Sequence, residues 1–186
     1  DDYIDIGSNI QIDGSFSFGG WVKNNGSDYT TIASKRVYSN AYYGWHLSYE
    51  DNGVMGFYVQ ENSSGPPTVS TTTDQIYNEI FHVTAVFDAG NNISLYINGE
   101  LAGTSATSLS SLSNNNAPLL ISSLQDPGSW IWDGLIKDFF IYDDALNASD
   151  VHEIFSNTIS LETNNLLGHW KFNQGSDGEY PNTLID

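Results

Sequence analysis

Short runs of alternating hydrophobic and polar residues fill this chain, separated by clusters of Gly, Asn, Asp and Ser. Alternation with a period of two places every second side chain on the same face, which is typical of a strand buried on one side. Many short strands at close spacing, joined by turn residues, predict an antiparallel sandwich of two sheets. The expected fold class is therefore all-β.

Two hairpin turns can be placed from their sequences. Asn98-Gly99 separates two apolar runs, and Asn-Gly supplies the positive φ angles that a type I′ turn needs. Asp51-Asn52-Gly53 joins the runs at residues 45–49 and 54–59 in the same way. Both turns predict that consecutive strands are neighbours in a sheet.

One helix is predicted, at about residues 148–157, directly after a strand-like run at residues 134–142. Asn147 is suited to accept hydrogen bonds from the free amides of the first helical turn. Asp150 lies in that turn, where a negative charge complements the positive end of the helix. The strand and helix together predict how the domain closes near its C-terminus.

Composition and charge limit the function. The 186 residues suit one sandwich domain with its own core, built without cysteine. The 23 acidic residues against 5 basic ones give a formal charge of −18, which argues against nucleic acid and against anionic membranes as partners. No apolar run approaches the roughly 20 residues of a membrane span, and no signal peptide opens the chain. Since residue 1 falls inside a predicted strand, we expect the sequence to be a piece of a longer protein.

Several motifs follow one another in a recognisable order: residues 1–7, 16–23, 82–88, 93–99 and 134–155. They resemble the opening strand, the central strand, the hairpin pair and the closing strand and helix of laminin-G-like domains. That family is a branch of the concanavalin A-like lectin/glucanase superfamily, and the resemblance covers nearly the whole chain. It implies a two-sheet antiparallel jelly-roll sandwich with one short helix near the C-terminus.

Catalytic patterns are missing from the sequence. Related glucanases carry a Glu-x-Asp-x-(x)-Glu pattern on one strand face, whereas Glu50, Glu61 and Glu79 lie at turns or strand ends here. There is no Gly-x-Ser-x-Gly elbow and no thiol, and the four histidines lie in separate elements. The sequence therefore argues against an enzyme.

Aromatic residues gather on two segments that the family resemblance brings to one rim of the sandwich. Sugar rings stack on aromatic planes, while Asn and Asp bind hydroxyl groups. The candidate ligand-binding residues are Tyr38, Asn40, Tyr42, Tyr43, Trp130 and Trp132. The alternative is that strand alternation sends about half of these aromatic residues into the core, Trp132 among them.

Calcium is the candidate cofactor, because it takes oxygen ligands from loops. In the family, two acidic residues usually stand where this chain has Lys137 and Asp138, and the Lys137 ammonium can occupy the place of the cation. At the loop rim used by laminin-G domains, the candidate ligands are Asn40, Asp126 and Asp133. An ordinary turn at Asp126-Pro127-Gly128 is the alternative there.

The C-terminal segment at residues 166–176 resembles the strand that begins these domains, although here it follows the closing helix. Either it opens a following repeat in the parent protein, or it completes the sheet of this domain beside the opening strand at residues 3–6. We therefore expect a single domain over residues 1–186 and leave both readings of residues 166–186 open.

These features favour a non-catalytic, lectin-like module of a larger extracellular or cell-surface protein, with a glycan or glycoprotein partner. Tandem domains in the parent protein are expected. The alternative is an adhesion or spacer module that makes protein contacts without a glycan site. A glycoside-active enzyme is the third reading.

Overall fold

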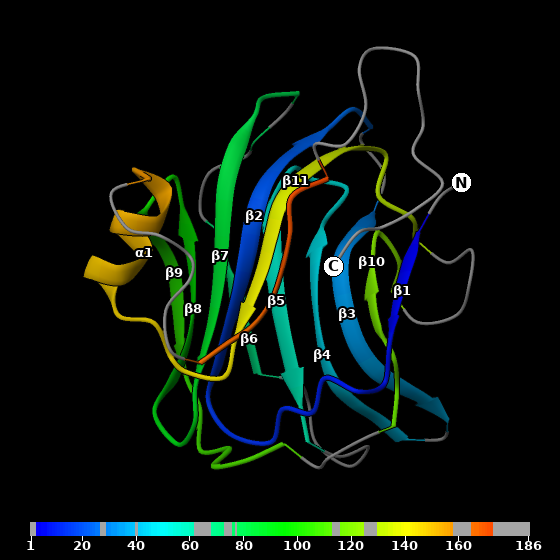
Figure 1. Ribbon diagram of the computed structural model, residues 1–186, viewed down its shortest axis with the longest axis vertical. Helices are drawn as coiled ribbons and strands as arrows, with labels where there is room; N and C mark the ends of the chain where they lie inside the picture. Colours follow the sequence, from blue (N-terminus) through cyan, green and yellow to red (C-terminus); the bar gives the residue numbers. More distant parts are fainter. Residues whose placement is uncertain are drawn as a thin grey trace.

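The computed structural model is a sandwich of two antiparallel sheets with one short helix in its described part (Figure 1). It describes residues 3–26, 29–39, 41–61, 68–72, 76, 78–112, 116–124, 130–157 and 165–172. Of residues 38, 39, 41, 42, 68 and 70 it describes the backbone alone. The predicted fold class is confirmed.

The first sheet has the strand order β1-β10-β3-β4-β5-β6. Its strands are β1 (Ile4–Gly7), β10 (Leu119–Ile121), β3 (Thr30–Ser39), β4 (Ala41–Tyr49), β5 (Met55–Gln60) and β6 (Thr68–Thr71). The second sheet has the order β12-β11-β2-β7-β8-β9. Its strands are β12 (Leu166–Trp170), β11 (Gly134–Tyr142), β2 (Phe16–Asn24), β7 (Phe81–Asp88), β8 (Asn92–Ile97) and β9 (Glu100–Ala106).

The predicted turns join β4 to β5 and β8 to β9. Asn98 and Gly99 have φ angles of 50° and 80°, the left-handed pair that a type I′ turn requires. Gly53 has a φ of 82°, and its N–H donates to the Glu50 carbonyl at 2.9 Å. Because Gly and Asn adopt positive φ at low cost, these residues fix where each hairpin turns.

The inner faces of the two sheets pack on a core rich in aromatic rings. Phe18 and Leu95 are fully buried, as alternation predicts. The Phe18 ring centroid lies 4.3 Å from that of Trp45 and 5.6 Å from that of Phe57, both of which come from the opposite sheet. Phe18 therefore ties the two sheets together.

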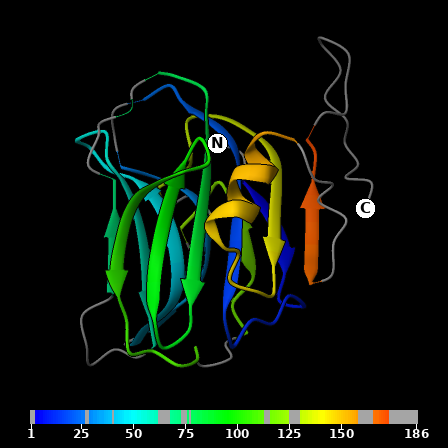
Figure 2. The same cartoon turned by 90° about the vertical axis from the view of Figure 1, so that its left-hand side faces the viewer.

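Helix α1 (Ala148–Phe155) lies on the outer face of the second sheet (Figure 2). The Asn147 side chain accepts hydrogen bonds from the Ser149 and Asp150 N–H groups, and the Asp150 carboxylate accepts one from the Asn147 N–H, as in a capping box. Val151 and Ile154 pack on outward side chains of β7, β8 and β11. In the described residues, no helix combines the length and the apolar character that crossing a bilayer requires.

Strand β12 pairs antiparallel with β11, so residues 166–170 form part of this domain. We expected this segment beside the opening strand, but β1 lies at an edge of the other sheet. Trp170 stands opposite Phe139 and is half-buried, with ring centroids 6.0 Å apart. This contact with a core residue explains why the segment joins β11. Residues 173–176 lie outside the described part.

His82 gives the fold a pH dependence. It lies on the outward face of β7 against the rings of Trp21, Phe140 and Phe155. Burial lowers its pKa from 6.5 to about 4, with Asp138 acting in the opposite direction. Between pH 6.5 and pH 4, the histidine of the unfolded chain takes up a proton while the folded His82 stays neutral. The contribution of His82 to the free energy of unfolding is therefore fully present above pH 6.5 and is lost as the pH falls towards 4.

We expect His82 to contribute about 3 kcal/mol to the loss of unfolding free energy over that interval. The variant His82→Phe keeps an aromatic ring and removes the titrating group. Urea unfolding of both proteins at about pH 7 and about pH 4 measures the difference. Equal acid destabilisation in the two proteins would contradict this assignment.

Candidate functional site

A group of aromatic and polar side chains lies on the outer face of the first sheet, over β3, β4 and β5. Trp45, Leu47 and Tyr49 face the core, so the residues between them, His46 and Ser48, face outward. We call this group the outer-face cluster. Its members are Tyr29, Arg36, His46, Ser48, Glu50, Tyr58 and Trp130.

His46 and Tyr58 form the floor of the cluster. They stand directly opposite each other on β4 and β5, and their rings stack with centroids 4.5 Å apart and planes 3° apart. Burial, and secondly the Arg36 guanidinium, lower the pKa of His46 well below 6.5. Arg36 Nη1 lies 3.3 Å from His46 Nδ1. The neutral imidazole therefore accepts a hydrogen bond from Arg36.

Glu50 is the carboxylate of the cluster and is bound by Tyr58. The Tyr58 hydroxyl donates to the Glu50 carboxylate, and burial together with Glu50 raises the pKa of Tyr58. Burial also raises the pKa of Tyr29, whose side chain interacts with those of Ser48 and Tyr58. Gly56 leaves room for this arrangement, because a Cβ there would lie 2.6 Å from Glu50 Oε1. The tyrosines are thus neutral hydroxyl groups held beside one carboxylate.

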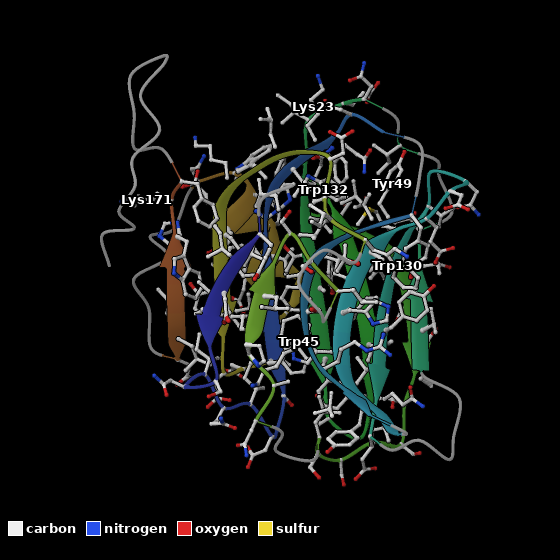
Figure 3. The ribbon with its side chains drawn as sticks, turned by 90° about the vertical axis from the view of Figure 1, so that its right-hand side faces the viewer. Lys23, Trp45, Tyr49, Trp130, Trp132 and Lys171 are labelled. Atoms are coloured by element: carbon white, nitrogen blue, oxygen red, sulfur yellow. The ribbon has the colours of Figure 1, made fainter. Side chains whose placement is uncertain are left out.

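Trp130 stands at the edge of the cluster with half of its surface exposed (Figure 3). Its carbonyl accepts from the Thr31 N–H at 2.8 Å, and its ring centroid lies 4.7 Å from that of Tyr29. Trp130 has a φ of 51°, and such a left-handed conformation costs a bulky residue about 1–2 kcal/mol. The backbone hydrogen bond and the ring contact hold the indole in this position.

Trp132 lies in the core, in agreement with the alternative in which strand alternation buries part of the candidate aromatic residues. It is 5% exposed, its Nε1 donates to the Leu135 carbonyl at 3.2 Å, and its ring lies edge-on to Tyr49. Alternation alone would place Trp130 and Trp132 on the same face. The left-handed backbone at Trp130 turns its indole outward instead, so Trp132 presents no free ring face to a ligand.

The other predicted aromatic segment does not meet Trp130. The side chains of Tyr38 and Tyr42, and all of Asn40, lie outside the described residues, and Tyr43 is half-buried. In the backbone, Tyr43 pairs with Val37 at the end of β3, whereas Trp130 bonds to Thr31 at its start. Six residues of strand span roughly 20 Å. Tyr43 and Trp130 therefore lie at opposite ends of β3 and do not share one rim.

Of the three predicted rim calcium ligands, the structure describes Asp133 alone. Asp133 is exposed beside Gly134, which pairs with Asn24, and Asn24 donates to Thr30 at the start of β3. Asn40 and Asp126 both lie outside the described part. The rim calcium site therefore stays a prediction.

At the second calcium position, a lysine ammonium lies beside the acidic side chain. Lys137 Nζ lies 3.3 Å from Asp138 Oδ2, so an ammonium already neutralises that carboxylate. Within the described ranges, no three His, Cys, Asp or Glu side chains are grouped as metal ligands. Calcium therefore stays a prediction.

Most of the outer-face cluster was missed in the sequence, and two local signals could have identified it. The turn at residues 51–53 fixes the register of β4 against β5, which places His46 opposite Tyr58. Alternation around Trp45 then sends both side chains outward. The contact between Trp130 and Tyr29 has no such local signal, because about 100 residues separate them in the chain.

Comparison with known proteins agrees with this fold. A family model of the concanavalin A-like lectin/glucanases superfamily matches residues 1–152. No curated protein matches the chain by sequence.

Solved structures share the fold at low identity. A candidate carbohydrate-binding protein from Bacteroides ovatus has 15% identity and a TM-score of 0.72, with 96% of this chain and 51% of that chain covered. A heptameric SAP-like pentraxin from Limulus polyphemus has 16% identity and a TM-score of 0.59, with coverage of 79% and 73%. The botulinum neurotoxin serotype D ligand binding domain, solved with N-acetylneuraminic acid, has 18% identity and a TM-score of 0.62, with coverage of 83% and 39%. This chain thus spans less than two thirds of the toxin chains.

Proposed function

This chain belongs to the concanavalin A-like lectin/glucanase superfamily, and we propose that it serves there as a non-catalytic carbohydrate-binding module. The observation that carries the proposal is the half-exposed indole of Trp130, held against Tyr29 at the edge of the outer-face cluster. We place the module in a larger extracellular or cell-surface protein with tandem domains. Sugar-binding proteins among the structures of this fold support the assignment.

The cluster offers the two kinds of contact that a sugar needs. The exposed Trp130 ring can pack against the C–H face of a pyranose. The Glu50 carboxylate has lone pairs beyond the one used by Tyr58 and can accept from sugar hydroxyls, while the Arg36 guanidinium can donate to them. Because these groups are already held by one another, little side-chain freedom is lost on binding.

The chemistry of the cluster supports binding without catalysis. Retaining and inverting glycosidases use a pair of carboxyl groups on either side of the scissile bond. The outer-face cluster contains one carboxylate, Glu50, and the Tyr58 hydroxyl already donates to it. Among the described members of the cluster, a glycan bound at Trp130 would therefore meet one carboxylate, whereas hydrolysis by this mechanism uses two.

A glycan array identifies the ligand, and Trp130→Ala then tests the site. We expect the variant to lose binding while its melting temperature stays nearly unchanged, because a half-exposed ring contributes more to a ligand than to the fold. Leu101→Ala is the matched control, since Leu101 is 55% exposed on β9 of the other sheet. If Trp130→Ala binds like the parent, the glycan site lies elsewhere. An array with no binding at all would favour the adhesion or spacer alternative.

Calcium enters the proposal as a separate prediction. No step of the proposed binding runs through the ion. The array is therefore run with millimolar calcium and again with a chelator. Binding that is lost in chelator supports calcium as a cofactor, and equal binding in the two conditions removes it.

A further inference from the structure

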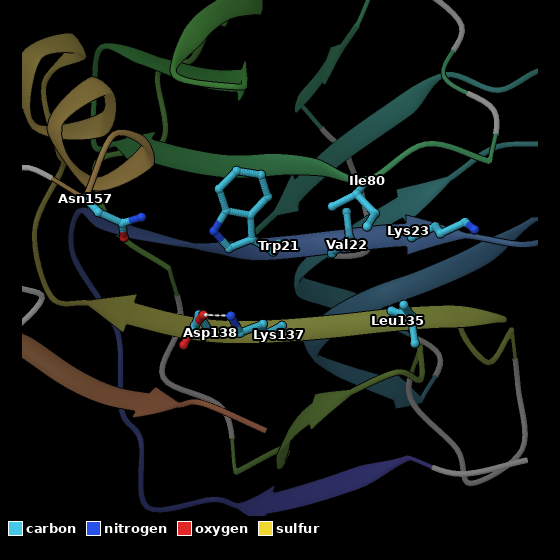
Figure 4. A pocket seen from close by; sticks show the side chains of 8 residues that line it. All are labelled: Trp21, Val22, Lys23, Ile80, Leu135, Lys137, Asp138 and Asn157. Carbon is cyan, nitrogen blue, oxygen red and sulfur yellow. Dashed lines mark ion pairs between the residues drawn. The ribbon is translucent and has the colours of Figure 1, made fainter. Parts of the chain in front are cut away.

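A pocket of about 480 Å³ lies on the outer face of the second sheet, on the opposite side of the sandwich from the outer-face cluster (Figure 4). Its floor is formed by neighbouring strands, with Trp21 and Lys23 on β2 and Leu135 and Lys137 on β11. Ile80 completes one wall just before β7 begins. Pockets for small molecules have volumes of roughly 300–1,000 Å³.

The pocket exists because helix α1 covers only part of this sheet face. Phe155, in the last turn of the helix, contacts the Trp21 ring with centroids 5.7 Å apart. Asn157, two residues after the helix ends, lines the pocket together with outward side chains of β2 and β11. Lys23 and Leu135 lie at the end of the pocket away from the helix (Figure 4).

The walls of the pocket are apolar to a degree unusual for this surface. Ile80 is 64% exposed and Leu135 is 60% exposed, which makes them two of the five large hydrophobic residues that are exposed in the described part. The register places Leu135 opposite Lys23 and Trp21 opposite Lys137. Grouped exposed apolar side chains with a polar rim mark binding sites.

The charge of the pocket is also unusual. The chain has 5 basic residues against 23 acidic ones, yet two of the five line this pocket. Lys137 is paired with Asp138 at 3.3 Å. Among the described side chains, none forms an ion pair with Lys23. An unpaired ammonium beside exposed aliphatic groups is a site for the anionic end of an amphipathic ligand.

We propose that this pocket binds a small amphipathic carboxylate. Its apolar body would lie against Trp21, Ile80 and Leu135, and its carboxylate would accept hydrogen bonds from the Lys23 ammonium. The net negative charge of the protein does not prevent this binding. At physiological salt, ions screen the repulsion between the ligand carboxylate and acidic side chains more than about 8 Å away. The inference does not depend on the proposed function, since the two sites lie on opposite sheets.

The probe is 4-phenylbutyrate, and 4-phenylbutyramide serves as its uncharged analogue. Binding is followed by the ¹H–¹⁵N resonance of the Trp21 indole, assigned with Trp21→Phe, and by the amides of β2 and β11. We expect saturable shifts at Trp21 with both compounds. The carboxylate should bind about two- to fivefold more tightly than the amide, as one exposed ion pair allows.

Two lysine variants separate a specific contact from general charge. Lys23→Gln should reduce the affinity for 4-phenylbutyrate to that for the amide. Lys171→Gln makes the same change of charge at an exposed lysine outside the pocket, and it should leave both affinities unchanged. Leu135→Ser should weaken the two compounds equally.

Three results would overturn the proposal. The first is the absence of a saturable shift at Trp21. The second is equal affinity of the unmodified protein for the carboxylate and the amide. This comparison does not depend on whether a variant folds. The third is a loss of affinity in Lys171→Gln as large as that in Lys23→Gln.

Discussion

Replacing Phe18 with Ala should lower the free energy of unfolding by about 3–5 kcal/mol. Phe18 is fully buried in β2, and its ring contacts Trp45 and Phe57 from the opposite sheet. The substitution removes buried apolar surface and also leaves a cavity. Because the strands on both sides are held by sheet hydrogen bonds, the surrounding core can close that cavity only in part.

Chemical denaturation at neutral pH measures this effect, with Leu101→Ala as the surface control. We expect Leu101→Ala to change the unfolding free energy by less than about 0.5 kcal/mol, as exposed substitutions do. Phe18→Leu should cost less than Phe18→Ala, because a leucine fills most of the cavity. A Phe18→Ala protein as stable as the control would show that Phe18 does not join the two sheets as described.

The elements of this fold could be predicted from the sequence because their signals are local. Asn98-Gly99 fixes one hairpin by its φ angles, and Asn147 with Asp150 fixes where the helix begins. Alternation placed Phe18 in the core correctly. Each of these features depends on residues within a few positions of one another, so one sequence was sufficient.

The site could be predicted only in part, because it depends on contacts between distant segments. Trp130 is exposed, as expected for a ligand-binding residue, yet its neighbour is Tyr29. Tyr43, from the other candidate segment, pairs at the opposite end of β3. Which end of a strand a loop reaches is set by long-range packing. The positive φ of Trp130 turns its side chain away from the face that Trp132 occupies. Bulky residues rarely adopt a positive φ, so the sequence gives no indication of it at Trp130.

Ending the chain after Asn164 should destabilise the protein by several kcal/mol, or drive it to associate, because this removes β12. Strand β12 pairs with β11 along residues 139–142, and Trp170 and Phe172 pack against the core. Without β12, the buried apolar surface of these side chains is lost. In addition, β11 becomes an edge strand with unpaired amides and carbonyls, which is a template for pairing with another chain.

The matched control ends the chain after Phe172, which keeps β12 and both aromatic side chains. Urea unfolding compares the stability of the two truncated proteins with that of the full chain, and light scattering after size-exclusion chromatography gives their association state. We expect the protein that ends at Phe172 to remain a stable monomer. The protein that ends at Asn164 should be less stable or should associate. If the protein ending at Asn164 remains monomeric with an unchanged unfolding midpoint, β12 contributes no stability to this sandwich. Residues 166–172 would then act as a linker towards a following domain, which is the other reading of this segment.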